Sequence, residues 1–459
     1  MPKRLTIDPC QETHFPHFVV LCVVFTFALV SAPRPCAGQN SWVQSGGLFW
    51  HNGPSWSYGF SPRPTDTAQF RRDRSPSQSA VFIDGNVAVA VAKILFVSDF
   101  HGSQHVQLAG FTGQPRLEID DRLLVRASTV GLFGSQESTL DITGVTVTSD
   151  TTVVEAYHGA FASLTLSDST LHMNETNIVG NSQFILESSH LRSGSAGAPV
   201  TIQPGAQLVV AAGESSITGN PKLTINGAAV LFGKLSVDQL EGLGQMVLYN
   251  DLVIDNSQPS FFFGTISGSG KLTKNGSGTL NLVGAPKTMM GGIEANGGTI
   301  IATQSAQLGD ENSTLRLNNA TLESAASFDV IQEIVLGSGS DGAFHVRGGQ
   351  TLGISGTVSG SGNLVKSGPG LLRLAAANTY VGETDIQEGT LQLLRHHAIG
   401  DNSAVRVASG GTLDLNGHSD TISSLSGSGR INLDGELTVN QLELGYFLGN
   451  IEGSGRLVK

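Results

Sequence analysis

The sequence predicts an all-β protein folded as a right-handed parallel β-helix, a solenoid of stacked coils. Composition is the first observation: Gly contributes 58 of 459 residues, whereas charged residues contribute only 14%. A chain with many turns and few helix-forming charged residues is typical of β structure. The second observation is a short alternation of aliphatic and polar residues, and the third is a long internal repeat.

The internal repeat is the most informative of the three. Residues 264–282 read GTISGSGKLTKNGSGTLNL, and residues 356–374 read GTVSGSGNLVKSGPGLLRL, 92 positions later. A third copy begins at Gly449, 93 residues after the second. Similar segments at a long, fixed spacing are typical of solenoids. At roughly 23 residues per coil, we expect four coils per repeat, with equivalent residues stacked on their own copies.

Within a repeat, short alternating segments predict the strands. In residues 279–282, Leu280 and Leu282 share one face, and residues 390–393 and 412–415 show the same pattern. Groups of Gly and Asn, which tolerate positive φ, separate such segments. These groups are residues 275–278, 368–370, 410–411 and 416–417. An Asn-Gly pair also favours an antiparallel hairpin, but the long repeat favours parallel coils, whose crossovers are right-handed.

The chain divides into four predicted segments. Residues 1–38 are predicted to be a signal peptide, because Lys3 and Arg4 precede an apolar run of 13 residues, which is too short to span a membrane comfortably. We expect cleavage near Ala37 or Gly38. Residues 39–100 are expected to form an N-terminal cap and the first strands, residues 101–263 degenerate coils, and residues 264–459 the repeats.

The predicted signal peptide contains all three cysteines, Cys10, Cys22 and Cys36. The mature chain therefore has neither a disulfide nor a thiolate metal site. The three tryptophans, Trp42, Trp50 and Trp56, lie close together. Because the first coil of a solenoid must be covered, we expect this aromatic cluster to be the N-terminal cap; a platform for stacking sugars is the alternative.

Candidate reactive residues are few, and we assign no catalytic, cofactor-binding or metal-binding residue. The net charge of −12 argues against a nucleic-acid partner, and the basic residues within 70–74 are interpreted as a solvated loop. Glu118 and Asp120 share one face of a predicted strand, which we interpret as an exposed face ending in a turn. His101 and His105 have a metal-ligand spacing only on a helix, and their neighbourhood reads as strand or loop.

Several other charged residues are interpreted as corners of coils. Asp310, Glu311 and Asp401 recur with the repeat, which favours a corner over a unique site. The pair His396-His397 beside Arg395 has the same interpretation. The sequence contains neither a nucleophile elbow of the G-x-S-x-G type nor a phosphate-binding G-x-x-x-x-G-K-[ST] motif.

Residues 356–393, GTVSGSGNLVKSGPGLLRLAAANTYVGETDIQEGTLQL, resemble the autotransporter-associated β-strand repeat. That family has the pattern G-x-I-S-G-S-G-x-L-x-K-x-G-x-G-x-L-x-L, followed by N-T-Y-x-G-x-T and G-T-L. The earlier copy matches the first half but has residues 287–289, KTM, where the later copy has residues 378–380, NTY. The resemblance covers residues 264–459, and residues 49–70 are similar to the aromatic head that precedes such repeats.

The resemblance implies a passenger region, a right-handed parallel β-helix exported to or released from the outer surface of a Gram-negative bacterium. Such passengers are adhesive or structural, so the expected partners are surface glycans or proteins of a host or of other bacteria. The family also implies an outer-membrane β-barrel, which this sequence lacks. Because the chain stops within a repeat at Lys459, we expect a truncated gene or a fragment.

The predicted function is therefore that of a non-enzymatic structural or adhesive passenger without a cofactor. The alternative is a carbohydrate-active β-helix enzyme, similar to a polysaccharide lyase or a glycosidase, with its catalytic residues in 101–263. That alternative requires one non-repeating cluster of Asp, Glu, Lys and Arg side chains in a groove.

Overall fold

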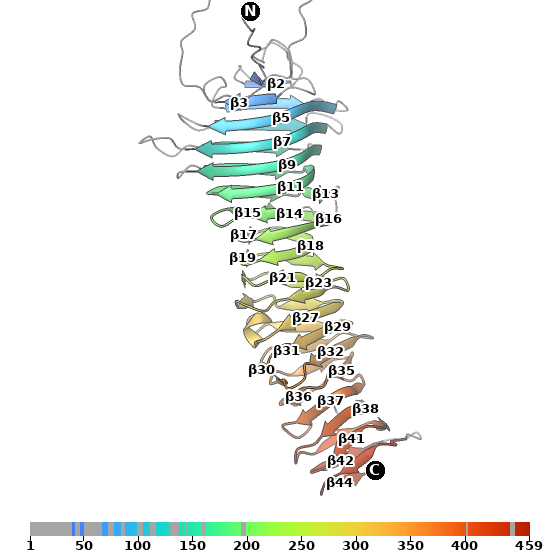
Figure 1. The fold of residues 1–459 in the computed structure, drawn as a ribbon. Helices are drawn as coiled ribbons and strands as arrows, with labels where there is room; N and C mark the ends of the chain where they lie inside the picture. Colours follow the sequence, from blue (N-terminus) through green and yellow to red (C-terminus); the bar gives the residue numbers. More distant parts are fainter. Residues whose placement is uncertain are drawn as a thin grey trace, which may run out of the picture.

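The computed structural model shows a rod of stacked β-coils (Figure 1). It describes residues 39–41, 46–49, 67–71, 78–83, 88–98, 104–110, 116–128, 137–143, 146–157, 161–193, 199–400, 403–440 and 446–459. Within these ranges the strands pair in parallel, and the only helical element is the 3-10 turn η2 (Ser305–Gln307). The predicted β-solenoid is confirmed, and the antiparallel hairpins that the Asn-Gly pairs also favoured are not found among the described strands. No described helix is long and apolar enough to cross a membrane.

Two parts of the prediction lie outside the described residues. The predicted signal peptide, residues 1–38, is one of them. The other is the aromatic cluster of Trp42, Trp50 and Trp56, which was expected to cap the first coil.

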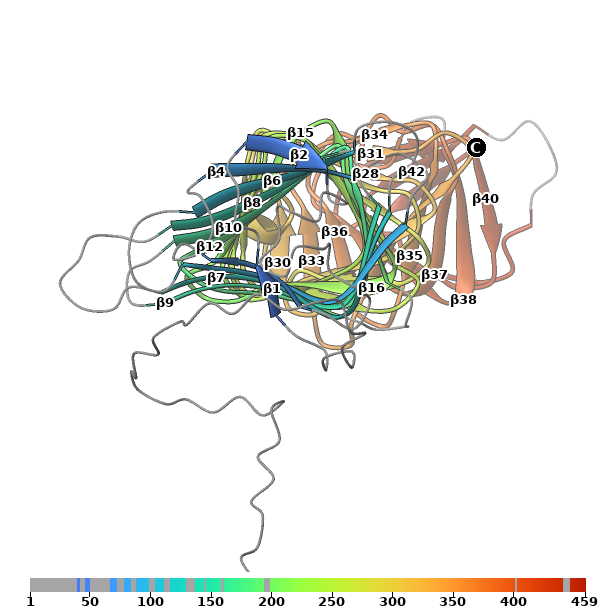
Figure 2. The ribbon, with the colours of Figure 1, turned by 90° about the horizontal axis from the view of Figure 1, so that it is seen from above.

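An 11-stranded sheet forms one wall of the solenoid, and in the view from above it faces the wall that contains β7 and β9 (Figure 2). Its strands are β2 (Gly46–Phe49), β4 (Gln78–Ile83), β6 (Gln104–Gly110), β8 (Glu137–Thr143), β10 (Phe161–Ser167), β12 (Ser182–Glu187), β15 (Gln207–Ala212), β17 (Ala228–Leu231), β19 (Gln245–Leu248), β22 (Thr265–Gly268) and β25 (Lys287–Met289). A three-stranded sheet near the C-terminus contains β39 (Asp420–Ile422), β42 (Glu436–Val439) and β44 (Arg456–Val458).

The remaining strands belong to a 30-stranded sheet that bends around the coil corners. They are β1 (Gln39–Ser41), β3 (Thr67–Arg71), β5 (Ala88–Ser98), β7 (Arg116–Ser128), β9 (Thr146–Tyr157), β11 (Thr170–Gly180), β13 (His190–Ser193), β14 (Pro199–Ile202), β16 (Glu214–Ile225), β18 (Lys234–Gly242), β20 (Leu252–Asp255), β21 (Ser260–Phe262), β23 (Leu272–Asn275), β24 (Thr279–Asn281), β26 (Ile293–Ala295), β27 (Gly298–Ala302), β28 (Thr314–Leu317), β29 (Ala320–Ser324), β30 (Phe328–Val330), β31 (Glu333–Leu336), β32 (Asp341–Val346), β33 (Thr351–Ile354), β34 (Val358–Gly360), β35 (Asn363–Ser367), β36 (Leu371–Leu374), β37 (Thr384–Leu393), β38 (Ala404–Asp414), β40 (Ser424–Gly427), β41 (Arg430–Asn432) and β43 (Asn450–Glu452).

Columns of stacked aliphatic side chains form the core. Side chains alternate between the two faces of a strand, so every second residue of each strand points into the solenoid. Under the 11-stranded sheet, paired inward residues form one such column. It contains Leu140, Leu164, Phe184, Leu208, Ala229, Met246 and Ile266, each at most 1% exposed. Full burial of one such large side chain stabilises the fold by roughly 1.5–3 kcal/mol. The predicted inward leucines Leu280 and Leu282 are also buried, which confirms the alternation.

The two copies of the repeat do not stack on each other, contrary to the prediction. From Leu272, the column of paired residues continues through Ile293, Leu315, Ile334 and Val358. Four coils therefore advance 86 residues, whereas the repeat advances 92. The equivalent of Leu272 is Leu364, which lies on the next strand, β35, and pairs with Gly342 and Thr384.

Variable corner lengths explain this shift, because one coil is not a fixed number of residues. Leu235 pairs with Leu252, only 17 residues later, whereas Gln104 pairs with Ser138, 34 residues later. The strand segments are repeated in sequence, but the lengths of the corners between them decide on which wall of the solenoid each segment lies.

Positive φ angles confirm most of the predicted corners. Gly276, Gly368, Asn416 and Gly417 have φ values of 72°, 74°, 46° and 77°. Residues 410–411 also lie at a bend between two strand segments, but they do so inside the strand β38 and without a positive φ. The two halves of β38 pair with different strands, β40 and β41, so the bend occurs without a break in the strand.

A buried lysine of the repeat closes one corner in each of the two copies. Lys274 lies in an aliphatic column between Ile254 and Ala295 and is fully buried. Its Nζ donates hydrogen bonds to the carbonyl oxygens of Asn275 and Gly276, at 2.8 and 2.9 Å. The long apolar stem thus packs in the core while the ammonium group satisfies carbonyl groups at the turn.

Lys366 repeats this arrangement one wall further on. Its Nζ donates to the carbonyl oxygens of Ser367, Gly368 and Glu388, at 2.9, 2.6 and 2.9 Å. The bond to Glu388 crosses to the next coil. Both lysines therefore satisfy carbonyl groups of their own corner, and Lys366 also links its corner to the next coil.

The glycine of the G-T-I and G-T-L motifs makes room for this lysine. Gly389 has φ +71°, and a Cβ there would lie 2.5 Å from the carbonyl oxygens of both Gly368 and Gly370 and 2.8 Å from Lys366 Nζ. Gly298 is related in the same way to Lys274 Nζ, also at 2.8 Å. The Lys and Gly of the motif, far apart in sequence, are thus one structural unit.

We predict that Gly389→Ala destabilises the protein much more than Gly349→Ala. Gly349 also has a positive φ, +74°, but nothing lies within 4 Å of its added Cβ. Gly349→Ala should therefore lower the free energy of unfolding only by the strain of a left-handed Ala, roughly 1–2 kcal/mol. Gly389→Ala should lower it by a further 1–3 kcal/mol, roughly, because of the steric clash. Urea unfolding of both variants measures the difference; equal losses would contradict the Lys–Gly unit.

We predict that three lysines titrate far below their ordinary value. Burial lowers the pKa of Lys274, Lys287 and Lys366 from 10.5 to about 8. Between pH 8 and 10.5 the unfolded chain then holds more protons than the folded chain, so these groups make stability rise with pH, and below pH 8 their contribution is constant.

¹³C NMR of the lysine ε-methylene groups tests this prediction. Three resonances should titrate near pH 8, and Lys366→Met should remove one of them. Between pH 8.5 and 9.5 the unfolding free energy of the Lys366→Met variant should also rise less steeply with pH than that of the wild type, by up to about 1.4 kcal/mol per pH unit. Midpoints near 10.5 for all lysines would show that these ammonium groups are not buried.

Candidate functional site

Strands β12, β15, β17, β19 and β22 present ordered columns of side chains on the outer face of the 11-stranded sheet. One column, at the start of the strands, contains Gln183, Gln207, Ala228, Gln245 and Thr265. The next outward column contains Ile185, Val209, Val230, Val247 and Ser267. Each column is in register because each strand pairs directly with its neighbours.

A groove of about 500 Å³ lies at the start of β12, β15, β17 and β19. Its lining comes from four successive coils, residues 181–183, 204–207, 226–228 and 243–245, and contains no charged residue. This volume is within the range of pockets that bind small molecules. Leu243 is 72% exposed at its rim.

Amide side chains supply most of the polar groups in this groove. Gln183 Nε2 donates to Gln207 Oε1 at 2.7 Å, and Leu243 N donates to Asn226 Oδ1 at 3.3 Å. The amide column is interrupted at Ala228, whose methyl group leaves a notch between Gln207 and Gln245. The groove can therefore offer hydrogen-bond donors and acceptors but no acidic or basic side chain, and its one hydroxyl group, that of Ser182, is buried and donates to the Val179 carbonyl oxygen at 2.7 Å.

Two aromatic rings stack just past the opposite end of the same strands. The centroids of Phe232 and Tyr249 lie 5.1 Å apart, with 1° between the ring planes. The side chains are 54% and 56% exposed. The position that follows Tyr249 in this column is the small residue Ser269, because Leu248 pairs with Gly268. This stack is a continuation of the coil-on-coil packing on the outside of the rod.

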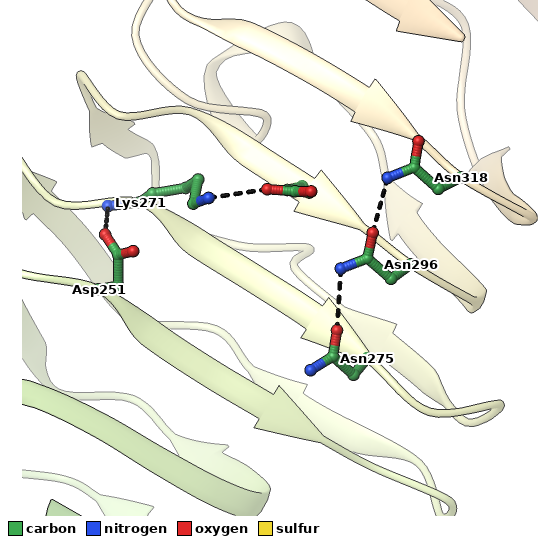
Figure 3. Close-up of polar contacts among 6 residues, drawn as sticks. Asp251, Lys271, Asn275, Asn296 and Asn318 are labelled. Atoms are coloured by element: carbon green, nitrogen blue, oxygen red, sulfur yellow. Dashed lines mark hydrogen bonds and ion pairs between the residues drawn. The ribbon is translucent and has the colours of Figure 1, made fainter. Parts of the chain in front are cut away.

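Polar contacts between successive coils recur elsewhere on the surface. Asn296 Nδ2 donates to Asn275 Oδ1 at 3.0 Å, and Asn318 Nδ2 donates to Asn296 Oδ1 at 2.6 Å, which forms a ladder over three coils (Figure 3). Beside it, Lys271 N donates to Asp251 Oδ1 and Lys271 Nζ pairs with Glu294 at 2.7 Å (Figure 3). These side chains hold neighbouring coils together.

Seven ion pairs between described residues have the same role. Each joins a basic and an acidic residue on neighbouring coils: Lys222–Glu241, Lys234–Glu214, Lys271–Glu294, Arg347–Glu323, Arg406–Asp385, Arg430–Glu452 and Arg456–Glu436. Among the side chains that the structure describes, no three or more His, Cys, Asp or Glu residues are grouped to hold a metal ion. Exposed pairs of this kind contribute at most about 1 kcal/mol each.

The structure does not bring the charged and histidine residues that the sequence analysis named together into one site. Glu118 and Asp120 lie in β7 and His105 lies in β6, but their side chains are outside the described part. His101, Asp401 and most of residues 70–74 also lie outside it. Asp310 is confirmed at a corner, where its Oδ1 accepts a hydrogen bond from Asn312 N at 3.0 Å.

His396 and His397 are confirmed at the corner between β37 and β38. The sequence did not reveal their partners in the next coil. The ring of His418 meets that of His396 edge-on at 5.1 Å, and Asp420 Oδ2 accepts hydrogen bonds from the backbone N–H groups of Ala398 and Ile399 at 2.9 Å. Burial raises the pKa of the Asp420 carboxyl group. This cluster fixes a corner from within.

The N-T-Y motif of the later copy is also structural. Asn378 Oδ1 accepts a hydrogen bond from Val358 N at 2.7 Å, and its Nδ2 donates to the Ala398 carbonyl oxygen at 2.6 Å. It therefore links three coils. Lys287, which takes the place of Asn378 in the earlier copy, is buried as well, and its Nζ donates to the carbonyl oxygens of Leu282 and Ala285.

Comparisons with known proteins agree with the repeat found in the sequence. Residues 272–302 and 364–393 match the passenger-associated-transport-repeat family. The chain is also 26% identical over 306 residues to the adhesin BmaC autotransporter of Brucella suis biovar 1 (strain 1330). That similarity covers 64% of this chain but only 8% of the relative. No solved structure matches the chain significantly.

We predict that the stacked rings stabilise each other. A double-mutant cycle of Phe232→Ala and Tyr249→Ala in urea unfolding should give a coupling energy of about 0.5–1.5 kcal/mol, because parallel offset rings attract beyond their buried area. The pair Phe232→Ala with Phe261→Ala, which lies on a different wall, serves as the control and should be additive. Additivity of both pairs would mean that the two rings do not touch in solution.

Proposed function

We propose that this chain, which carries the passenger repeats of autotransporters, is a surface-displayed or secreted adhesive passenger of a Gram-negative bacterium. It adheres through its outer faces and catalyses no reaction. The observation that carries this proposal is the similarity to a known adhesin over 64% of the chain. The similarity covers only 8% of the relative, so adhesion by this chain is a proposal that does not follow directly from the name of the relative.

The architecture supports an adhesive role. Stacked coils give a long rod whose outer side chains stand in columns, and neighbouring coils are joined by hydrogen-bonded amides and one-to-one ion pairs. A stiff rod of this kind holds a binding face away from the surface that carries it. The shallow groove beside β15, β17 and β19 is uncharged, which suits binding better than acid–base chemistry.

Export is the first part of the proposal that can be tested. We propose that residues 1–38 are a signal peptide removed near Ala37 or Gly38. Residues 1–45 fused to an alkaline phosphatase without its own signal should give phosphatase activity in intact Escherichia coli. Replacing Leu21, Val23 and Val24 with Asp should abolish this activity, because a charged core cannot enter the translocation machinery as an apolar segment. Equal activity from both fusions would contradict the assignment.

Adhesion is the second part. Latex beads coated with the purified chain should adhere to at least one cell type in a panel of bacterial and mammalian cells, several-fold more than beads coated with albumin. Incubation with the polysaccharides of those cells should release no new reducing or unsaturated sugar ends. Adherence equal to that of albumin on every cell type would contradict the adhesive function, and released sugar ends would instead favour the carbohydrate-active alternative.

A further inference from the structure

We infer that the groove at the start of β15, β17 and β19 binds a neutral glycan, with one sugar ring seated over Ala228 between Gln207 and Gln245. This inference rests on the proposed adhesive function and names the class of its ligand. The argument uses the charge of the lining, the chemistry of its amides, the spacing of the coils and the pairing of the strands.

The lining excludes ligands that need a counter-charge. None of the groove residues is acidic or basic. A phosphate, a sulfate or a uronic acid would lose its hydration without gaining a cationic partner, which is unfavourable. The net charge of the chain, −12, adds a repulsion for polyanions. A neutral ligand is therefore favoured.

The amides match a ligand that both donates and accepts hydrogen bonds. A carboxamide carries a carbonyl oxygen and an NH₂ group on one head, and a sugar hydroxyl is both donor and acceptor. The bond between Gln183 and Gln207 uses one polar atom of each amide. Gln245 is exposed on the other side of the notch. At the rim, exposed Leu243 offers an apolar contact for the C–H face of a sugar ring.

The spacing of the coils matches a chain of sugar rings. Neighbouring strands lie about 4.8 Å apart, so the two amides that flank Ala228 are separated by two spacings, about 9.6 Å. One coil spacing is close to the length of one pyranose unit in an extended polysaccharide. The groove crosses four coils along the rod, so consecutive sugars would meet consecutive coils.

A peptide partner fits this groove less well. Extended peptides commonly bind by adding a strand to an unpaired sheet edge. Here the strands beneath the groove are already paired on both sides: β15 with β12 and β17, and β17 with β15 and β19. The floor thus offers no free backbone groups for strand addition, and recognition must use side chains.

The substitution Ala228→Gln tests the inference because it completes the amide column and fills the notch. Thr265→Gln is the matched control, since it adds the same side chain to the same column one coil beyond the groove. Gln245→Ala is a second test variant at an exposed position, where loss of folding is not expected. Circular dichroism and urea midpoints confirm that each variant folds like the wild type.

Binding is measured on the full chain by saturation-transfer NMR and calorimetry. The probes are neutral hexasaccharides (β-1,4-glucan, β-1,3-glucan, β-1,4-mannan, β-1,4-xylan, α-1,4-glucan and β-1,4-linked N-acetylglucosamine) and the acidic hexagalacturonate. At least one neutral probe should bind at millimolar concentration or below. Ala228→Gln should weaken that binding about tenfold or more, which corresponds to about 1.4 kcal/mol. Gln245→Ala should weaken it several-fold, and Thr265→Gln should leave it unchanged.

Three results would overturn the inference. They are the absence of binding by every neutral probe, binding of the acidic probe alone, and neutral binding that Ala228→Gln leaves intact. Bead adhesion with the same variants separates this failure from failure of the proposed function. If wild-type and Ala228→Gln beads adhere equally, the groove is not the adhesive site but adhesion stands; if wild-type beads do not adhere, the adhesive function itself is wrong.

Discussion

Parallel, in-register pairing between successive coils is the constraint on which the rest of this structure depends. Each strand shares its hydrogen bonds with the coils before and after it, so every side chain is stacked on residues 17 to 34 positions away in sequence. Which residue types a position accepts therefore depends on the column of stacked side chains to which the position belongs. Aliphatic residues fill the inner columns, whereas the outer columns hold amides, ion pairs and, on the 11-stranded sheet, β-branched residues such as Val209 and Val230. A corner must fit against the corner of the neighbouring coil.

The repeat motif follows from this constraint. Its lysine is embedded in an aliphatic column, and its ammonium group satisfies carbonyl groups at the corner, with the Lys366 head reaching Glu388 in the next coil. The glycine of G-T-L, 23 residues later, leaves the space for that head. The motif thus encodes contacts between coils, and any function must come from outward positions that the motif does not fix.

The sequence was sufficient to predict a parallel β-solenoid, but it was not sufficient to predict which residues of successive coils pair with each other. Alternation in segments such as residues 279–282 correctly predicted which leucines are buried, because that pattern depends only on local geometry. The stacking of Leu272 on Leu364 was wrong, because corner lengths vary and shift the strands between walls. The candidate groove escaped prediction for the same reason: Gln207, Ala228 and Gln245 become neighbours only through the register.

The most direct test of this account is a disulfide between paired outer residues. With Cys10, Cys22 and Cys36 replaced by Ser, the chain contains no other cysteine. Ala228→Cys with Gln245→Cys should cross-link on mild oxidation, since paired residues on neighbouring strands lie about 4.8 Å apart, within disulfide range. Gln207→Cys with Gln245→Cys, two coils apart, should not. Cross-linking of the second pair without the first would contradict the coil register and, with it, the groove.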